Sequence, residues 1–86
     1  MSTPKIELLT KPGCHLCEAA RATTGEVTAR FGLTFTEVNI EDDTQLFERH
    51  KNEIPVLLVD GEVKDFWQVN AKRLAKILEK KLAGQE

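Results

Sequence analysis

Both cysteines of this 86-residue chain, Cys14 and Cys17, lie in one short segment, Lys-Pro-Gly-Cys-His-Leu-Cys, with two residues between them. An apolar stretch typical of a strand precedes the segment, and a helical pattern follows it. A thiol at the start of a helix faces unpaired N–H groups and the positive end of the helix dipole, and both favour the thiolate. A second thiol three positions further lies on the same face, one turn along the helix. Thiol–disulfide exchange needs this pairing of an exposed thiolate with a nearby second thiol.

The predicted roles of the two thiols differ because their positions differ. Cys14, at the helix start, is expected to be open and to act as the nucleophile, whereas Cys17 is expected to be covered and to resolve the mixed disulfide. Two alternatives stay open here: a structural disulfide or two buried core cysteines, and a metal site. With His15 the two thiolates supply three ligands, one short of the usual four of a closed zinc site, so we predict no metal site. His15 either lends positive charge to the Cys14 thiolate or is an exposed histidine at a helix start.

Length and composition limit the classes of function. Eighty-six residues suffice for one small domain, 1–86, and leave no room for a second core. A formal net charge of −2 provides no basic field for nucleic acid and no polybasic surface for a membrane, and the longest apolar run, 54–59, is too short to span a bilayer. The first residues lack the apolar core of a signal peptide, so we expect a cytoplasmic protein. In a reducing compartment a cysteine pair is more often catalytic or metal-binding than a structural staple.

Hydrophobic periodicity predicts seven elements around the cysteine pair. The first strand, 5–10, carries apolar residues on both faces, as an inner strand covered on two sides does. A helix follows from Cys14 to the cap residue Gly32. Its buried stripe includes Leu16, and its interior Gly25 weakens it by about 1 kcal/mol relative to alanine. The remaining expected elements are a strand at 33–39, a short helix that the pair Asp42/Gln45 caps and Asn52 ends, a hairpin of strands 55–59 and 62–66, and a helix from the cap residue Asn70 to Leu82.

The order strand, helix, strand, helix, strand, strand, helix predicts an α/β fold. The first strand–helix–strand unit gives a parallel pair, and the hairpin with its Asp60-Gly61 turn adds an antiparallel pair. We therefore expect a mixed four-stranded sheet flanked by helices. Phe66 and Trp67, at the end of the last strand, are expected in the core rather than in a substrate groove, and His50 is expected on the surface or half-buried.

This order of elements, with Cys-x-x-Cys after the first strand and Ile54-Pro55 opening the third, resembles the thioredoxin superfamily in its minimal, glutaredoxin-sized form. More narrowly, the segments 11–17 (KPGCHLC) and 54–61 (IPVLLVDG) are similar to those of small glutaredoxin-like proteins. The resemblance covers nearly the whole chain and implies a thioredoxin-like β-α-β-α-β-β-α fold. It also implies that Cys14 is the nucleophile, that Cys17 is the resolving thiol, and that the Ile54–Pro55 bond is cis and lies beside the cysteines.

The same resemblance implies how a substrate would be held. The backbone of Ile54, the residue before the proline, would pair with a bound substrate strand, and Lys11 matches a lysine that glutaredoxins use toward glutathione. The Gly-Gly-acid sequence that holds the other end of glutathione is absent, and residues 66–70 (FWQVN) stand in its place. Thioredoxins carry a buried carboxylate behind the resolving cysteine; Glu7 is the nearby strand candidate here, and we assign it no such role. A metal cluster shared between two chains and completed by glutathione thiols stays open by family analogy.

We therefore predict a glutaredoxin-like thiol–disulfide oxidoreductase whose catalytic residues are Cys14 and Cys17. The residues expected to bind substrate are Lys11, His15, Ile54 and Pro55. The expected partners are a disulfide-bearing protein or a small thiol, with glutathione as a possible co-substrate, and neither nucleic acid nor a membrane. We expect a monomer without a resident cofactor or metal. The alternative is a non-catalytic module of this fold that binds a partner protein or senses redox state.

Overall fold

The sheet is organised around an inner strand, β1 (Ile6–Thr10), that is covered on both faces. Ile6 packs into one apolar cluster and Leu9 into a second cluster on the other face, as expected for this strand. The structure, a computed structural model, describes residues 3–84. The outermost two residues at each end of the expected 1–86 domain therefore lie outside the described part.

Within the described residues, four strands form a mixed sheet in the order β2-β1-β3-β4. β2 (Thr36–Asn39) runs parallel to β1 and places Glu37 next to Leu8. β3 (Val56–Val59) runs antiparallel to β1, and β4 (Glu62–Phe66) runs antiparallel to β3. The expected parallel pair and hairpin are confirmed, and the chain has the α/β, thioredoxin-like order of elements.

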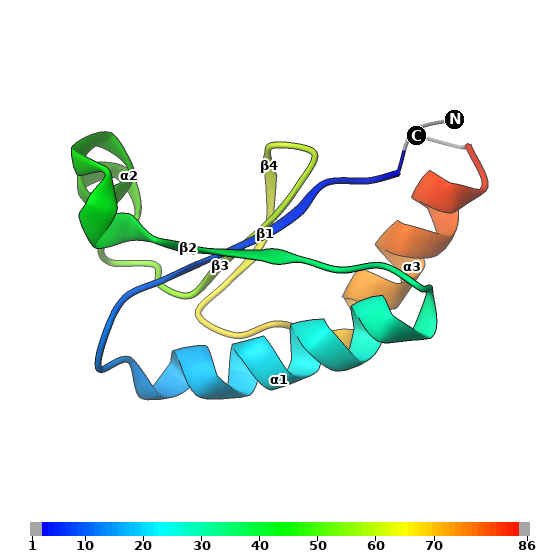
Figure 1. Ribbon diagram of the computed structural model, residues 1–86, viewed down its shortest axis with the longest axis horizontal. Coiled ribbons are helices and arrows are strands. Elements are labelled where there is room, and N and C mark those ends of the chain that lie inside the picture. The colour runs from blue at the N-terminus through cyan, green and yellow to red at the C-terminus, as the bar shows by residue number, and fades with distance from the viewer. Residues whose placement is uncertain (1–2, 85–86) are drawn as a thin grey trace.

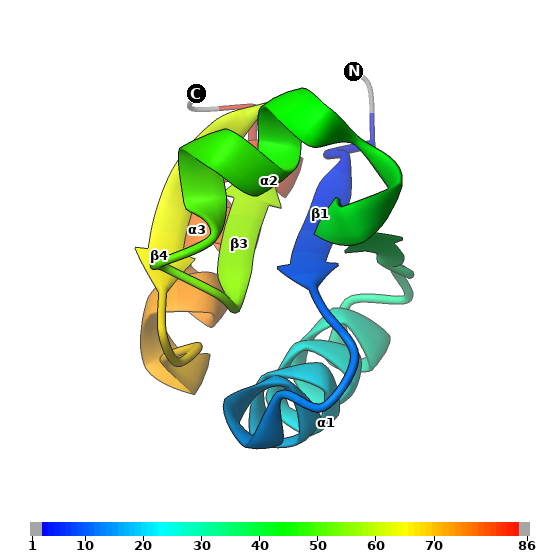
Figure 2. The same cartoon turned by 90° about the vertical axis from the view of Figure 1, so that its left-hand side faces the viewer.

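Helices cover the two faces of the sheet (Figure 1). α1 (His15–Arg30) and α3 (Ala71–Leu82) lie together on one face, and the short α2 (Thr44–His50) lies on the other (Figure 2). The apolar cluster under α1 and α3 has as its buried members Ile6, Val27, Leu57, Val59, Leu74 and Leu78. α1 thus packs on this core through its C-terminal half, and its N-terminal end reaches the cysteines. Among the described helices, none has the length and apolar composition to cross a membrane.

Local signals in the sequence explain where most elements start and end. The side chain of Asn70 accepts a backbone N–H of the first turn of α3 at 3.0 Å, as predicted for a cap. α1 runs without a break through Gly25 and ends before Gly32, whose φ of +68° is the left-handed conformation expected of a cap glycine. Asp60 and Gly61 have φ values of 53° and 82°, the geometry of a two-residue hairpin turn of type I′.

The second strand and the second helix begin later than predicted. β2 begins at Thr36 rather than at 33, and the preceding Leu33 and Phe35 pack on the core from an irregular segment. α2 is capped by Asp43 rather than by Asp42. Oδ1 of Asp43 accepts two backbone N–H groups of the first turn, at 2.9 and 3.2 Å, whereas Asp42 belongs to a short 3-10 turn, η1 (Ile40–Asp42), just before it.

Predictions at three other positions are also wrong. Asn52 does not adopt the left-handed conformation. The C-cap residue of α2 is Lys51, which keeps a right-handed helical conformation. Leu82, expected on the inward face of the last helix with Leu74 and Leu78, is exposed, and Leu16, expected in the buried stripe of α1, is 54% exposed. The stripe of α1 begins at the next residue, and its buried members are Cys17, Ala20, Thr24, Val27 and Thr28. A cysteine thus occupies the inward position that the pattern assigned to a leucine.

Replacing the interior glycine of α1 is expected to stabilise the protein. Gly25→Ala should raise the free energy of unfolding by about 0.5–1 kcal/mol, because glycine loses more backbone entropy than alanine in a helix. A Cβ at this position would meet a ring carbon of Phe35 at 3.6 Å, an ordinary van der Waals distance. Urea unfolding measures the change. Gly32→Ala is the matched control and should lower the free energy of unfolding, because the φ of +68° at Gly32 disfavours a side chain. If Gly25→Ala also lowers the free energy of unfolding, the unstrained packing of α1 on Phe35 is contradicted.

Candidate redox site

Cys14 lies at the N-cap position of α1. Its Sγ accepts the backbone N–H of Cys17 at 3.3 Å, so the sulfur takes the place of the serine or aspartate oxygen of an ordinary helix cap. The N–H groups that a helix start leaves unpaired stabilise an anionic acceptor. Cys14 is half-buried, so solvent reaches one side of it. This position suits an attacking sulfur.

Cys17 lies one turn further along α1 and is only 1% exposed. It belongs to the second apolar cluster, whose other buried members are Leu9, Ile40, Ile54 and Val56. Burial, and next a hydrogen bond with Cys14, raise the pKa of the Cys17 thiol to about 11. The backbone N–H of Lys11 and the positive charge of Arg21 act in the opposite direction. At neutral pH Cys17 is therefore a thiol, and the two cysteines have different environments within one helical turn.

The loop before β3 packs against the cysteines. The Ile54–Pro55 bond is cis, as the resemblance implied, and both residues are buried. Ile54 shares the apolar cluster of Cys17, and Cys14 packs against the same cluster. The fold therefore brings four of the predicted site residues, two from α1 and two from this loop, into one region.

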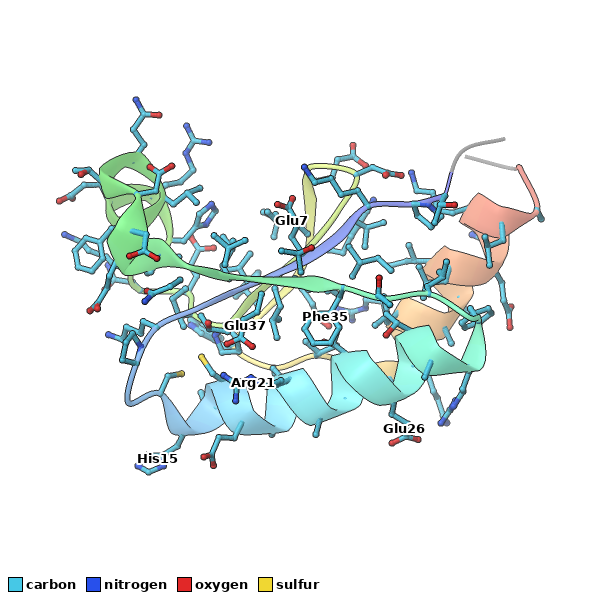
Figure 3. All side chains as sticks on the ribbon, viewed as in Figure 1. Glu7, His15, Arg21, Glu26, Phe35 and Glu37 are labelled. Atoms are coloured by element: carbon cyan, nitrogen blue, oxygen red, sulfur yellow. The ribbon has the colours of Figure 1, made fainter. Side chains whose placement is uncertain are left out.

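Lys11 and His15 lie on the outer side of the pair. Both are exposed, and they line a shallow hollow of about 220 Å³ beside Cys14, together with Pro12, Gly13, Glu18 and Arg21. The side chain of His15 points away from the sheet (Figure 3). The hollow thus has basic groups on its rim, where they can meet an anionic group next to a disulfide.

Trp67 anchors the loop before β3, a role that the sequence did not predict. Its backbone N–H donates to the carbonyl oxygens of Pro55 at 2.8 Å and Glu53 at 3.1 Å, and its indole N–H donates to the carbonyl of Asn52 at 3.0 Å. Trp67 adopts a φ of +70°, which is strained for an aromatic residue. Trp67 is 54% exposed and Phe66 is also exposed, with the two rings in edge-to-face contact at 5.0 Å, so their predicted place in the core is wrong.

An ion pair beside Cys17 was also not predicted. Nε and Nη2 of Arg21 donate to the two carboxylate oxygens of Glu37 at 2.7 and 2.6 Å, and Oγ1 of Thr10 donates to Glu37 Oε2 at 2.9 Å. Figure 3 shows both charged side chains between α1 and β2, with Glu7 on the other side of the sheet. The hydrogen bonds from Arg21, aided by the one from Thr10, lower the pKa of the Glu37 carboxyl. Arg21 follows Cys17 by four residues, so the helical spacing alone could have identified it. Glu37 comes close to Arg21 because β2 lies beside β1, which the local sequence does not reveal.

Two further features are not part of the cysteine region, a buried histidine and a larger hollow. His50 is buried, contrary to expectation, and its Nδ1 has no hydrogen-bond partner among the described residues. A larger hollow of about 570 Å³ is lined by Asp65 and residues 68–73, around the start of α3, and contains neither cysteine. Within residues 3–84, no group of three or more His, Cys, Asp or Glu side chains is arranged to hold a metal ion.

Comparison with known proteins gives relatives over most of the chain. A family model described as Glutaredoxin-like domain (DUF836) matches residues 5–79. An uncharacterised protein of Mycobacterium tuberculosis is 28% identical over 79 residues, which cover 86% of this chain and 81% of that protein. A glutaredoxin-like protein of Dictyostelium discoideum is 30% identical over 64 residues, which cover 67% of this chain and 59% of that protein.

Solved structures with the same fold support this relationship. A structural-genomics target protein from X. campestris has a TM-score of 0.70 at 28% identity, covering 86% of this chain and 95% of that one. A chloroplastic thioredoxin z has a TM-score of 0.76 at 12% identity, covering 95% and 80%, which is a likeness of fold alone. From the family match and these folds together, the chain belongs to the glutaredoxin-like domain family of the thioredoxin superfamily.

Proposed function

We propose that the protein is a thiol–disulfide oxidoreductase that uses the Cys14–Cys17 pair on a disulfide substrate. The family and the Cys-x-x-Cys spacing indicate a redox-related function. The observation that carries the finer proposal is the asymmetry of the two thiols. Cys14 is half-buried at the cap of α1, while Cys17 is 1% exposed one turn deeper. One sulfur is thus reachable by a substrate, and the other is reachable chiefly by the first.

In the first step the Cys14 thiolate attacks one sulfur of the substrate disulfide. A bond forms between Cys14 and that sulfur, and the substrate S–S bond breaks. The second substrate sulfur leaves as a thiolate and takes a proton from water. The product is a mixed disulfide between Cys14 and the substrate.

In the second step Cys17 loses its proton to solvent and attacks Sγ of Cys14. The Cys14–Cys17 disulfide forms, the mixed disulfide breaks, and the remaining substrate sulfur leaves as a thiolate, which takes a proton from water. The substrate has gained two electrons, and the cysteine pair has lost them. Two molecules of a thiol such as glutathione then return the pair to the dithiol and become a disulfide themselves.

The substrate is proposed to be a disulfide-bearing protein or a small thiol disulfide, acted on by a monomeric cytoplasmic enzyme. Lys11 and His15, on the rim of the hollow beside Cys14, would meet an anionic group next to the disulfide. On the other side, the backbone of Ile54 would pair with an extended substrate segment beside Pro55. The cluster of apolar side chains around Ile54 keeps this loop against the cysteines.

A second candidate function is a protein-binding or redox-sensing module. It is favoured by the exposed apolar side chains near the site, Leu16 on α1 and the pair Phe66 and Trp67 at the end of β4. Such residues are frequent at protein interfaces. A binding module needs no resolving thiol, so the loss of either cysteine would leave its affinity unchanged.

Cys17→Ser is expected to trap a mixed disulfide, because the second step has lost its nucleophile. Incubation with a disulfide-bearing peptide, without a reductant, should give a stable adduct on Cys14, visible by mass spectrometry, and release of the second peptide thiol should fall by about a hundredfold or more. Cys14→Ser should give no adduct and no release. If both variants release both thiols at the wild-type rate, the proposed mechanism is wrong, and a wild-type protein that reacts with no disulfide would favour the module.

The two thiols are also expected to differ in reactivity. In single-cysteine variants, iodoacetamide at mildly alkaline pH should label Cys14 at least about tenfold faster than Cys17, because Cys17 is buried and its pKa is raised to about 11. The difference should narrow as the pH approaches 11. Intact-mass measurement gives both rates. Labelling in denaturant is the control and should be equal for the two cysteines; equal rates in the folded protein would contradict the assigned roles.

A further inference from the structure

Few groups next to the Cys17 thiol carry charge. β1, η1 and the loop before β3 contribute apolar side chains, Leu9, Ile40 and Ile54, and α2 contributes Leu46 and Phe47 to the same cluster. The groups whose charge acts on Cys17, Arg21 or Glu37 are Cys14 at the cap of α1, Glu18 and Arg21 on α1, and Glu37 on β2; α2 also carries the buried His50, and the turn before α1 carries the exposed Lys11. Of these, Arg21 carries the positive charge that favours the Cys17 thiolate. Its position, one turn beyond Cys17, is fixed by the bidentate contact with Glu37.

The environment of Cys17 creates a kinetic problem for the second step. In the dithiol state, burial and next the hydrogen bond with Cys14 raise the pKa of Cys17, so only a very small fraction of Cys17 is a thiolate at pH 7. In the mixed disulfide, the sulfur of Cys14 is bonded covalently and carries no charge, so it no longer opposes ionisation of Cys17. Burial still opposes it, and the favourable groups that remain are the N–H of Lys11 and the charge of Arg21.

We propose that Arg21 is a positioning residue, held by Glu37, whose positive charge promotes ionisation of Cys17 and so speeds release of the mixed disulfide. The proposal rests on the proposed function for its kinetic part, since only an enzyme with a resolving step would benefit. Cys17 gives its proton to solvent, and Arg21 stays protonated throughout. Thr10 supports the arrangement from β1, because its hydroxyl holds the second oxygen of Glu37.

In a different role for the Arg21–Glu37 ion pair, Glu37 would accept the proton of Cys17. The contacts argue against it, because both carboxylate oxygens already accept strong hydrogen bonds from Arg21 and one also accepts from Thr10. These donors lower the pKa of Glu37, which makes the carboxylate a weak base. The guanidinium charge is therefore the active feature of the pair.

The chain offers a matched control on the same helix. Arg30 donates to Glu26 at 2.7 Å in an exposed i,i+4 pair near the C-terminal end of α1, and Figure 3 shows Glu26 far from Arg21 along the helix. Arg30→Gln removes the same charge from the same helix as Arg21→Gln does. A general effect of net charge or of helix stability would appear in both variants.

The first experiment measures ionisation without turnover. In a Cys14→Ser background, the ultraviolet absorbance of the Cys17 thiolate is followed against pH; the chain has no tyrosine, so no phenolate absorbs in the alkaline range. Arg21→Gln should reduce the thiolate fraction at a given alkaline pH by about threefold to tenfold, and Arg30→Gln should leave it unchanged. Arg21→Lys keeps the positive charge but loses the bidentate contact with Glu37. Its thiolate fraction should therefore lie between those of Arg21→Gln and the protein with Arg21 intact. Identical titrations for Arg21→Gln and Arg30→Gln would overturn the proposal.

The second experiment measures the resolving step itself. With both cysteines present, an aromatic disulfide reagent forms the mixed disulfide at Cys14, and attack by Cys17 releases a second coloured thiol in a separate phase. Arg21→Gln should slow this second phase by about threefold to tenfold at neutral pH, and by more than it changes the first phase, because Arg21 also lines the hollow beside Cys14 where the reagent binds. Arg30→Gln should leave both phases unchanged. Glu37→Gln should not slow the second phase, because a glutamine oxygen can still hold Arg21 while a negative charge is removed.

A second phase that slows as much in Glu37→Gln as in Arg21→Gln would overturn the proposal in favour of a role for the carboxylate. Urea unfolding of each variant checks its structure; if Arg21→Gln is destabilised, the comparison of Arg21→Lys with wild type decides, and an Arg21→Lys second phase as slow as that of Arg21→Gln in a folded protein overturns the role of the charge. If the wild-type protein shows no second phase at all, the proposed function fails. The titration in the Cys14→Ser background still decides the role of Arg21 in that case, so the two failures are distinguishable.

Discussion

The start of α1 is the point on which the rest of the structure depends. Sγ of Cys14 accepts the N–H of Cys17, and this contact requires a sharp turn between β1 and the helix. Gly13 makes the turn with a φ of +77°, a conformation that disfavours a side chain. β1 can fix the beginning of this turn because it is buried on both faces, between β2 and β3. The inner strand, the turn and the helix cap thus together fix the position of the Cys14 sulfur.

One helical turn gives the two thiols opposite environments. The cap position offers Cys14 unpaired N–H groups and contact with solvent, whereas the next turn places Cys17 among apolar side chains from β1, η1 and the loop before β3. The same helix then adds Arg21 one turn later, with Glu37 of β2 as its partner. At the other end of α1, Val27 packs with residues of β3 and α3 in the first apolar cluster. The helix is therefore held to the sheet by an apolar cluster at each end, and the charged pair Arg21 and Glu37 lies between them.

Much of the fold could be predicted because its signals are local. A proline opens β3, Asp60-Gly61 can form the tight turn, and Asn70 and Gly32 are good caps in any surroundings. The boundaries that were missed depend on competition between neighbours, as when Asp43 rather than Asp42 caps α2. The covered place of Cys17 was predicted from its position one turn into the helix, yet the periodicity also placed Leu16 inward, where the structure leaves it 54% exposed.

The parts of the site that could not be predicted come from residues distant in sequence. Glu37 meets Arg21 because β2 lies parallel to β1, and Trp67 meets the loop before β3 because β4 returns beside β3. Trp67 belongs to the segment 66–70 that, by the resemblance, replaces the Gly-Gly-acid sequence of glutaredoxins, and its strained backbone is offset by bonds to the carbonyls of Asn52, Glu53 and Pro55. Because Pro55 has no N–H and its carbonyl already accepts from Trp67, the proposed pairing with a substrate segment is assigned to the backbone of Ile54. With an aromatic side chain on this side and basic groups around the hollow on the other, a substrate of the proposed enzyme would be held by charge mainly from the Lys11 side of Cys14.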